Sequence, residues 1–216
     1  IEDEISANEA LDTIQGELYK ISTNSATSEL KDMQTVTSDT LAYIEKMKKL
    51  GNKYLIGQTT GFEALDKKTT GFNEGDLVII AARPAMGKTA LVLNMALKNV
   101  ERGKGVIFFS LEMPAEQLML RMLAAKTSIP LQNLRKGDMD DKEWSILSAA
   151  FDDLNSKKLF VDDGGSININ QLRARVRKLA QIQENNISLV IIDYLQLMQG
   201  LGNKDRHQEV SDISRG

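Results

Sequence analysis

A glycine, a lysine and a threonine follow one another directly at Gly87, Lys88 and Thr89, at the end of the stretch AARPAMGKT. In a loop between a strand and a helix, successive backbone N–H groups can surround a phosphate, and the helix start adds the positive end of its dipole. Lys88 would then reach the β- and γ-phosphates of ATP, and the Thr89 hydroxyl would bind Mg²⁺. These residue types in this order predict a phosphate-binding loop.

The loop departs from the general pattern G-x-x-x-x-G-K-[ST] at its first position, which is Ala82. Ala82 only opens the loop, so an ordinary backbone conformation can suffice there. Gly87, by contrast, lies where the backbone must pass close to phosphate without a Cβ, and Pro84 stiffens the turn by fixing its own φ. The predicted nucleotide-binding residues are Ala82, Arg83, Pro84, Ala85, Met86, Gly87, Lys88, Thr89 and Ala90.

Carboxylates follow two apolar stretches further along the chain. Asp193 ends LVIID, which predicts a position at the carboxyl edge of a sheet, where it could hold Mg²⁺ together with Thr89. Glu112 ends GVIFFSLE and should lie at the same edge, where it could activate the water that attacks the γ-phosphate. Asp162 and Asp163 also stand at a strand end and remain rivals for that role. Glu112 is preferred because its strand directly follows the helix of the loop.

Short apolar stretches alternate with helical patterns over much of the chain. Such alternation predicts an α/β fold with a mainly parallel sheet and helices on both faces. On the predicted helix 140–155, Trp144 lies on the apolar stripe, which favours a core position over a base-stacking platform. The predicted strands are 76–82, 105–112, 158–163 and 188–197, and the predicted helices of this part are 89–101, 115–126, 140–155 and 168–184.

The first part of the chain has a different organisation. Leu11, Ile14, Leu18 and Ile21 recur at helical spacing, so residues 1–21 are predicted to form an amphipathic linker helix. Its apolar stripe could pack on the same chain or on a neighbouring copy. Residues 22–53 read as a polar linker with a short helix at 38–50, and residues 54–216 as the main domain.

Composition narrows the class of protein. The chain has 216 residues, 42% of them hydrophobic, a formal net charge of −3 and no cysteine. No apolar run approaches the roughly 20 residues that a membrane span needs. We therefore expect a cytoplasmic protein without membrane contact, disulfides or thiol chemistry.

Three stretches resemble the RecA-like motor domain of the DnaB family of bacterial replicative DNA helicases: TGFEALDKKTTGFNEGDLVIIAARPAMGKT, SLEMPAEQLMLRML and LVIIDYLQLM. The resemblance runs from about Leu55 to the last residue, and the family's own loop, A-R-P-x-M-G-K-T, accounts for Ala82. It implies a P-loop ATPase that uses ATP and Mg²⁺. By the same resemblance Lys88 binds phosphate, Thr89 and Asp193 bind magnesium, and Glu112 activates water.

The resemblance also implies an assembly and partners. The family forms homo-hexameric rings that hydrolyse ATP between neighbouring subunits, translocate on single-stranded DNA, and work with primase and a helicase loader. The helix of residues 1–21 resembles the family's linker helix, which docks on the adjacent subunit. A RecA-like recombinase and a non-motor ATP-dependent switch stay open as alternatives. Arg121 matches a family position, but its chemistry suggests no role.

Direct signs of DNA contact are few. Lys204 and Arg206 lie in a glycine-bearing polar loop and could touch phosphates, although the sequence slightly favours a plain solvated loop. In the family, an arginine finger and the main DNA-contacting loop fall beyond the position of Gly216. On that resemblance, we expect the 216-residue chain alone to bind Mg-nucleotide weakly and to hydrolyse it negligibly.

Overall fold

The computed structural model describes residues 31–50, 55–83 and 85–195. The chain divides into two compact units, Ile1–Lys53 and Tyr54–Gly216, and each is considered by itself. The predicted linker helix of residues 1–21 lies outside the described residues. Within the described part of the chain, no helix combines the length and apolar character needed to cross a membrane.

The first unit contains helix α2, Met33–Leu50. It begins earlier than the predicted residue 38 because Asp32 accepts a hydrogen bond from the N–H of Thr35 at 2.8 Å, which caps the helix start. Its apolar side chains Leu41 and Ile44 are both more than half exposed. The helix is therefore present, but Leu41 and Ile44 are not buried in a core.

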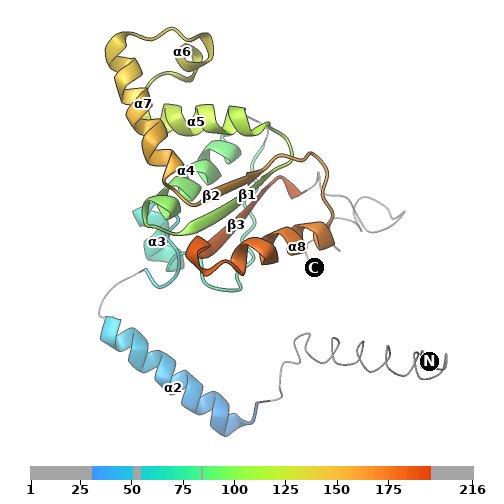
Figure 1. Cartoon of the computed structure of the whole chain (residues 1–216). Coiled ribbons are helices and arrows are strands. Elements are labelled where there is room, and N and C mark those ends of the chain that lie inside the picture. Colours follow the sequence, from blue (N-terminus) through green and yellow to red (C-terminus); the bar gives the residue numbers. More distant parts are fainter. Residues whose placement is uncertain (1–30, 51–54, 84, 196–216) are drawn as a thin grey trace, which may run out of the picture. The chain divides into compact units, whose positions relative to one another are not determined.

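A three-stranded parallel sheet forms the centre of the second unit (Figure 1). Its strands are β1 Gly105–Ser110, β2 Leu159–Asp162 and β3 Ile187–Asp193, in the order β2-β1-β3. The register pairs Phe109 with Asp162 and Ser110 with Asp193, so the carboxyl ends of all three strands meet at one edge. The predicted parallel sheet is confirmed.

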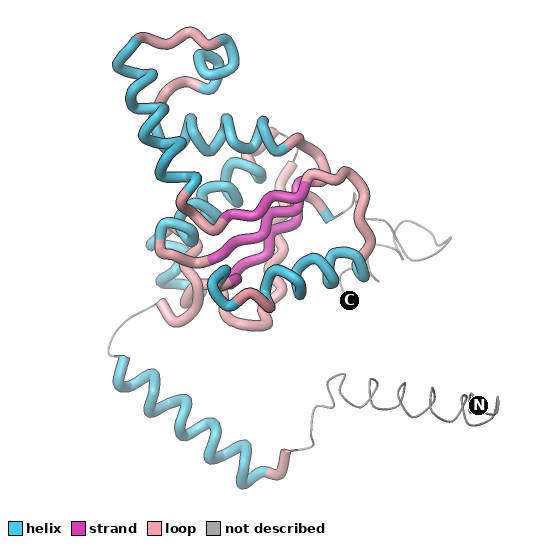
Figure 2. The backbone as a smooth tube through the Cα atoms, viewed as in Figure 1, coloured by secondary structure: helices cyan, strands magenta, loops and turns pink. Residues whose placement is uncertain are grey.

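Helices cover both faces of this sheet, as Figure 2 shows. Because side chains alternate along a strand, Val106 and Phe108 join a core with the helices on one face, while Ile107 and Phe109 pack with α8 on the other. β1 is buried along its whole length. The covering helices are α4 Lys88–Glu101, α5 Ala115–Thr127 and α7 Asp141–Asn155 on the first face and α8 Ile169–Ala180 on the second.

Two short helices, α3 Glu63–Thr69 and α6 Leu131–Lys136, were not predicted from the sequence. The predicted helix 168–184 is shorter than expected: α8 ends at Ala180, and a separate 3-10 turn, η1 Gln183–Asn185, follows it. The longer helices α7 and α8 each begin with a capping box, in which the N-cap side chain and the side chain three residues later bond to each other's backbone. These local signals explain why the starts of α7 and α8 lie close to their predicted positions.

The predicted strand 76–82 is wrong for the described residues. Leu77, Val78 and Ile79 are 69%, 51% and 71% exposed, and no described segment pairs with this stretch. Ile80 alone turns inward and packs against the core beside α4. An apolar, β-branched sequence favours extended backbone, but a strand also needs a hydrogen-bonding neighbour.

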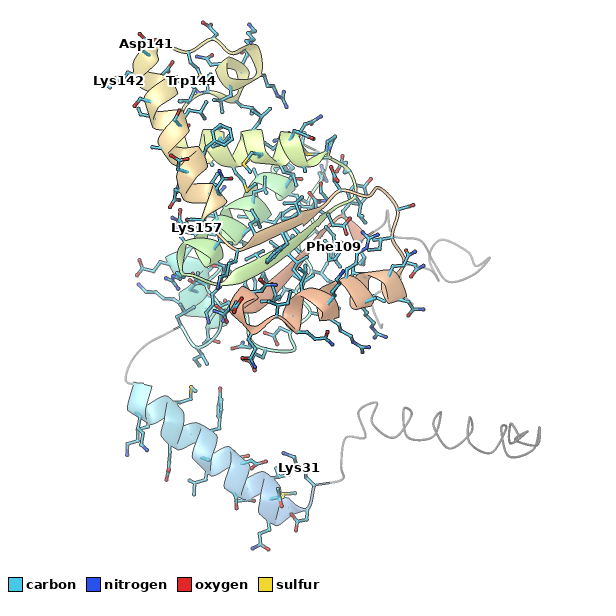
Figure 3. All side chains as sticks on the ribbon, viewed as in Figure 1. Lys31, Phe109, Asp141, Lys142, Trp144 and Lys157 are labelled. Atoms are coloured by element: carbon cyan, nitrogen blue, oxygen red, sulfur yellow. The ribbon has the colours of Figure 1, made fainter. Side chains whose placement is uncertain are left out.

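The predicted core position of Trp144 is also wrong. Its side chain is 60% exposed, and Figure 3 shows it near the start of α7 beside Asp141 and Lys142. α7 instead buries Leu147, Ala150 and Leu154. At 3.6 residues per turn, Trp144 lies roughly a quarter-turn away from that buried line. The predicted stripe of Trp144, Leu147 and Phe151 shares only Leu147 with the buried line, and its other two members are exposed.

A buried carboxylate fixes the segment that precedes the loop. Asp66, which is 4% exposed, accepts hydrogen bonds from Thr59 Oγ1 at 2.5 Å, Thr60 N at 2.7 Å and Thr60 Oγ1 at 2.6 Å. Burial raises the pKa of Asp66, but these hydrogen bonds and the charge of Arg102 outweigh it, so the net pKa is lowered from 3.8. Asn99 of α4 donates to the carbonyl of Thr59 at 2.8 Å, which ties this segment to α4.

We expect Asp66→Ala to lower the free energy of unfolding by about 2–3 kcal/mol at neutral pH, because the lost hydrogen bonds are made to a charged, buried group. The folded-state pKa of Asp66 is below its unfolded value of 3.8, so this stabilisation is complete above pH 3.8 and disappears as the pH falls through the folded value. Chemical denaturation at several pH values measures both effects. Glu63→Ala, on the exposed side of α3, is the matched control and should change stability by no more than about 0.5 kcal/mol. Equal losses in the two variants would contradict the prediction.

Candidate nucleotide-binding site

The loop before α4 has the backbone conformation that its glycine permits. Gly87 is the N-cap of α4 and has φ 87° and ψ 21°, in the left-handed region, and Ala85 also has a positive φ, of 62°. A Cβ added at Gly87 would meet no atom within 4 Å. Within the described chain, the requirement for glycine therefore comes from the backbone angle rather than from crowding. Pro84 lies outside the described residues.

The start of α4 is open to an anion. Among the residues that the structure describes, no side chain caps its first N–H groups, and its first turn carries no acidic residue, in contrast to the capping boxes of α7 and α8. Free N–H groups and the positive end of the helix dipole make such a terminus suitable for phosphate. The preceding loop residues Ala82, Arg83, Ala85 and Met86 are exposed, as is Ala90 in the first turn of α4.

Two of the predicted site residues converge on the carboxylate of a third. Lys88 Nζ lies 2.9 Å from Asp193 Oδ1, and the Thr89 hydroxyl donates to Asp193 Oδ2 at 2.6 Å. Lys88 and Thr89 are the first residues of α4, and Asp193 is the last residue of β3, so the contact joins the helix start to the carboxyl edge of the sheet. The structure thus brings together residues that are more than one hundred positions apart in sequence.

The chemistry of this cluster fits Mg²⁺. Asp193 is 4% exposed, and its Oδ1 has no hydrogen-bond partner, because the approach of Lys88 is an ion-pair contact without hydrogen-bond geometry. A buried carboxylate oxygen with a free lone pair, next to a threonine hydroxyl, offers the hard oxygen ligands that Mg²⁺ prefers. A cation held by only two protein oxygens would take its remaining ligands from phosphate and water.

Tyr194 belongs to the same cluster, although its role was not predicted. Its ring centroid lies 4.3 Å from Lys88 Nζ, a cation–π distance. The contact limits where the lysine ammonium can lie. In the sequence, the one feature that could have indicated this contact is that an aromatic residue, Tyr194, directly follows Asp193.

Glu112 lies near the same edge in a turn between β1 and α5. Ser110, the last residue of β1, is the register partner of Asp193, and Glu112 follows it by two positions. Its side chain is exposed and makes no ion pair or hydrogen bond with another described residue. A carboxylate that is not engaged elsewhere can accept a proton from a water molecule.

The rival carboxylates have structural partners instead. Asp162 forms an ion pair with Arg175 of α8 and accepts a hydrogen bond from the N–H of Gly164 at 3.2 Å. Asp163 Oδ2 accepts a hydrogen bond from the N–H of Ala115, the first residue of α5, at 2.9 Å. These contacts favour Glu112 as the carboxylate available for chemistry.

Other predicted residues are not part of this cluster. Lys204 and Arg206 lie outside the described residues. Arg121, on α5, has its Nε buried without a hydrogen-bond partner. Nothing in the described residues shows what that nitrogen binds.

The parallel sheet, the left-handed glycine before α4 and the meeting of Lys88, Thr89 and Asp193 define the class of RecA-like P-loop ATPases. Solved structures agree with this class. One that is titled as an ATPase domain matches with a TM-score of 0.76 and 28% identity, over 82% of this chain and 64% of that one. A structure titled as a DnaB-like replicative helicase and its interactions with primase matches with a TM-score of 0.74 and 27% identity, over 97% of this chain and 49% of that one.

The chain belongs to the DnaB-like helicase C terminal domain family, whose model matches residues 57–216. It is 40% identical over 210 residues to the replicative DNA helicase DnaB of Helicobacter pylori, covering 97% of this chain and 43% of that protein. It is 42% identical over 220 residues to the replicative DNA helicase DnaC of Bacillus subtilis, covering 99% and 47%. The chain thus spans less than half the length of these curated relatives. The resemblance to the DnaB family that was inferred from the motifs is confirmed.

Proposed function

We propose that this chain is the ATP-hydrolysing motor part of a replicative DNA helicase, which couples ATP hydrolysis to translocation on single-stranded DNA and to duplex unwinding. The observation that carries the proposal is the convergence of Lys88 and Thr89 on the buried carboxylate of Asp193. Membership of the DnaB-like family supports the helicase assignment over a recombinase or a non-motor switch.

Each residue of the cluster has a part in this proposal. The N–H groups at the start of α4 bind phosphate oxygens, and Lys88 turns from Asp193 toward the β- and γ-phosphates of ATP. Thr89 and Asp193 hold Mg²⁺, which when bound neutralises charge on those phosphates. Glu112 orients a water molecule and takes its proton as the water attacks the γ-phosphorus, and the bond between that phosphorus and the bridging oxygen breaks so that ADP leaves.

The proposed partners follow from the family. They are single-stranded DNA, further copies of the same chain in a homo-hexameric ring, primase and a helicase loader, all in the cytoplasm. One similar solved structure is titled for the interactions of a DnaB-like replicative helicase with primase. We assign Lys204 and Arg206 to contacts with the DNA backbone, since cations in a stretch predicted to be a glycine-bearing loop suit phosphate.

A strand-displacement assay on a forked DNA duplex tests the proposal. The full native protein that carries this chain should separate the strands with ATP and Mg²⁺ and should fail with a non-hydrolysable ATP analogue. Single-stranded DNA should also raise its rate of ATP turnover. Filaments that pair homologous strands would instead indicate a recombinase, and nucleotide binding without DNA-stimulated turnover would indicate a switch.

A further inference from the structure

The turn that carries Glu112 is held at both of its ends. At its start, the N–H of Leu111 donates to the carbonyl of Asp193 at 2.9 Å. Within it, Ser110 Oγ donates to the carbonyl of Met113 at 2.6 Å. These bonds fix the end of the turn that follows β1. The first of them ties that end to Asp193, the proposed magnesium ligand at the end of β3.

The other end of the turn is held by a residue from a distant segment. α5 begins at Ala115 after Pro114, and no side chain of its own N-cap bonds to its first N–H groups. Asp163 supplies that bond from the segment after β2, through Oδ2 to the N–H of Ala115 at 2.9 Å. A carboxylate at this position also interacts favourably with the positive end of the helix dipole.

We propose that Asp163 is a positioning residue for Glu112, which sets the direction of the turn by anchoring the start of α5. The inference rests on the proposed role of Glu112 in ATP hydrolysis. Asp163 does not contact nucleotide in this scheme; it acts only through the residues between Ser110 and Ala115. The hydrogen bonds of Ser110 and Leu111 hold one end, and Asp163 holds the other, so the carboxylate of Glu112 is presented from a turn with two fixed ends.

The test compares Asp163→Ala with Asp163→Asn in the full native protein. The alanine variant cannot accept the hydrogen bond, and we expect its ATP turnover to fall at least about 10-fold, since a displacement of about 1 Å can cost about 10²-fold. Its nucleotide affinity should not change, because the phosphate loop is untouched. The asparagine variant keeps an accepting oxygen and should recover most of the turnover. Glu116→Ala is the matched control, because it removes an acidic side chain from the same first turn without removing a bond to the Ala115 N–H.

Two further measurements separate positioning from a general structural effect. Amide hydrogen exchange at Ala115 should become faster in Asp163→Ala and remain native in Glu116→Ala. In a Glu112→Gln background, Asp163→Ala should cause no additional loss of turnover, because its effect passes through Glu112. An equal additional loss in that background, or native turnover of Asp163→Ala beside a slow Glu112→Gln, would overturn the inference. Native turnover of Glu112→Gln itself would instead contradict the proposed function.

Discussion

Replacing Glu112 by glutamine in the full native protein should leave ATP binding intact and slow hydrolysis by at least ~10²-fold, the scale expected for loss of a positioned base. Glutamine has nearly the same shape but cannot accept a proton at neutral pH. The exposed carboxylate has no partner among the described residues, so the substitution breaks no contact that stabilises the fold. Steady-state turnover and a separate measurement of nucleotide affinity distinguish the two effects.

The matched comparison for Glu112→Gln is Asp163→Asn, which makes the same chemical change at the rival carboxylate. Its amide oxygen can still accept the hydrogen bond from Ala115, so most of the activity should remain. If Asp163→Asn were the slow variant and Glu112→Gln the active one, the two carboxylates would have been assigned the wrong roles.

Replacing Lys88 by alanine should remove the charge that the nucleotide phosphates require. We expect nucleotide affinity to fall by about 10- to 100-fold, the equivalent of one lost hydrogen bond between charged groups, and turnover to fall with it. The fold should persist, because the Lys88 side chain is 27% exposed and Asp193 keeps the hydrogen bond from Thr89. Titration with a fluorescent ATP analogue and a thermal unfolding curve measure the two properties.

Lys98→Ala is the control for the lysine substitution. Lys98 lies on the same helix and makes a surface ion pair with Glu101 at 2.9 Å. It follows Lys88 by ten residues, so it is not part of the phosphate-binding loop. Its removal should leave nucleotide affinity unchanged. A folded Lys88→Ala protein with native affinity would contradict the assignment of the phosphate-binding loop.

The sequence predicted the parts of the site that depend on local order. Glycine, lysine and threonine in succession specify a loop and a helix start by local backbone geometry alone. The apolar run that ends in Asp193 specifies a strand end, and parallel strands meet at one edge. The loop pattern and the strand end are therefore enough to predict, from the sequence alone, that Lys88, Thr89 and Asp193 lie in one region.

The remaining features depend on contacts that no local pattern encodes. The hydrogen bond from Ala115 to Asp163 joins residues 48 positions apart, and Asp163 was therefore predicted only as a rival base. Trp144 was placed in the core because its stripe was apolar, whereas burial is decided by the neighbouring helices. The stretch 76–82 is apolar enough for a strand, but pairing is a property of two segments and not of one.

Helix α4 connects the phosphate-binding loop to a buried hydrogen bond between Asn99 and Thr59. Lys88 is its first residue, and Asn99, which is fully buried near its other end, is bonded to the carbonyl of Thr59. At 1.5 Å per residue these two positions are about 16 Å apart along the axis, so a tilt of roughly 4° about Asn99 displaces Lys88 by about 1 Å. A displacement of that size can cost about 10²-fold in rate. Besides the buried apolar residues that pack α4 against the sheet, this hydrogen bond near its far end therefore helps to set where Lys88 lies.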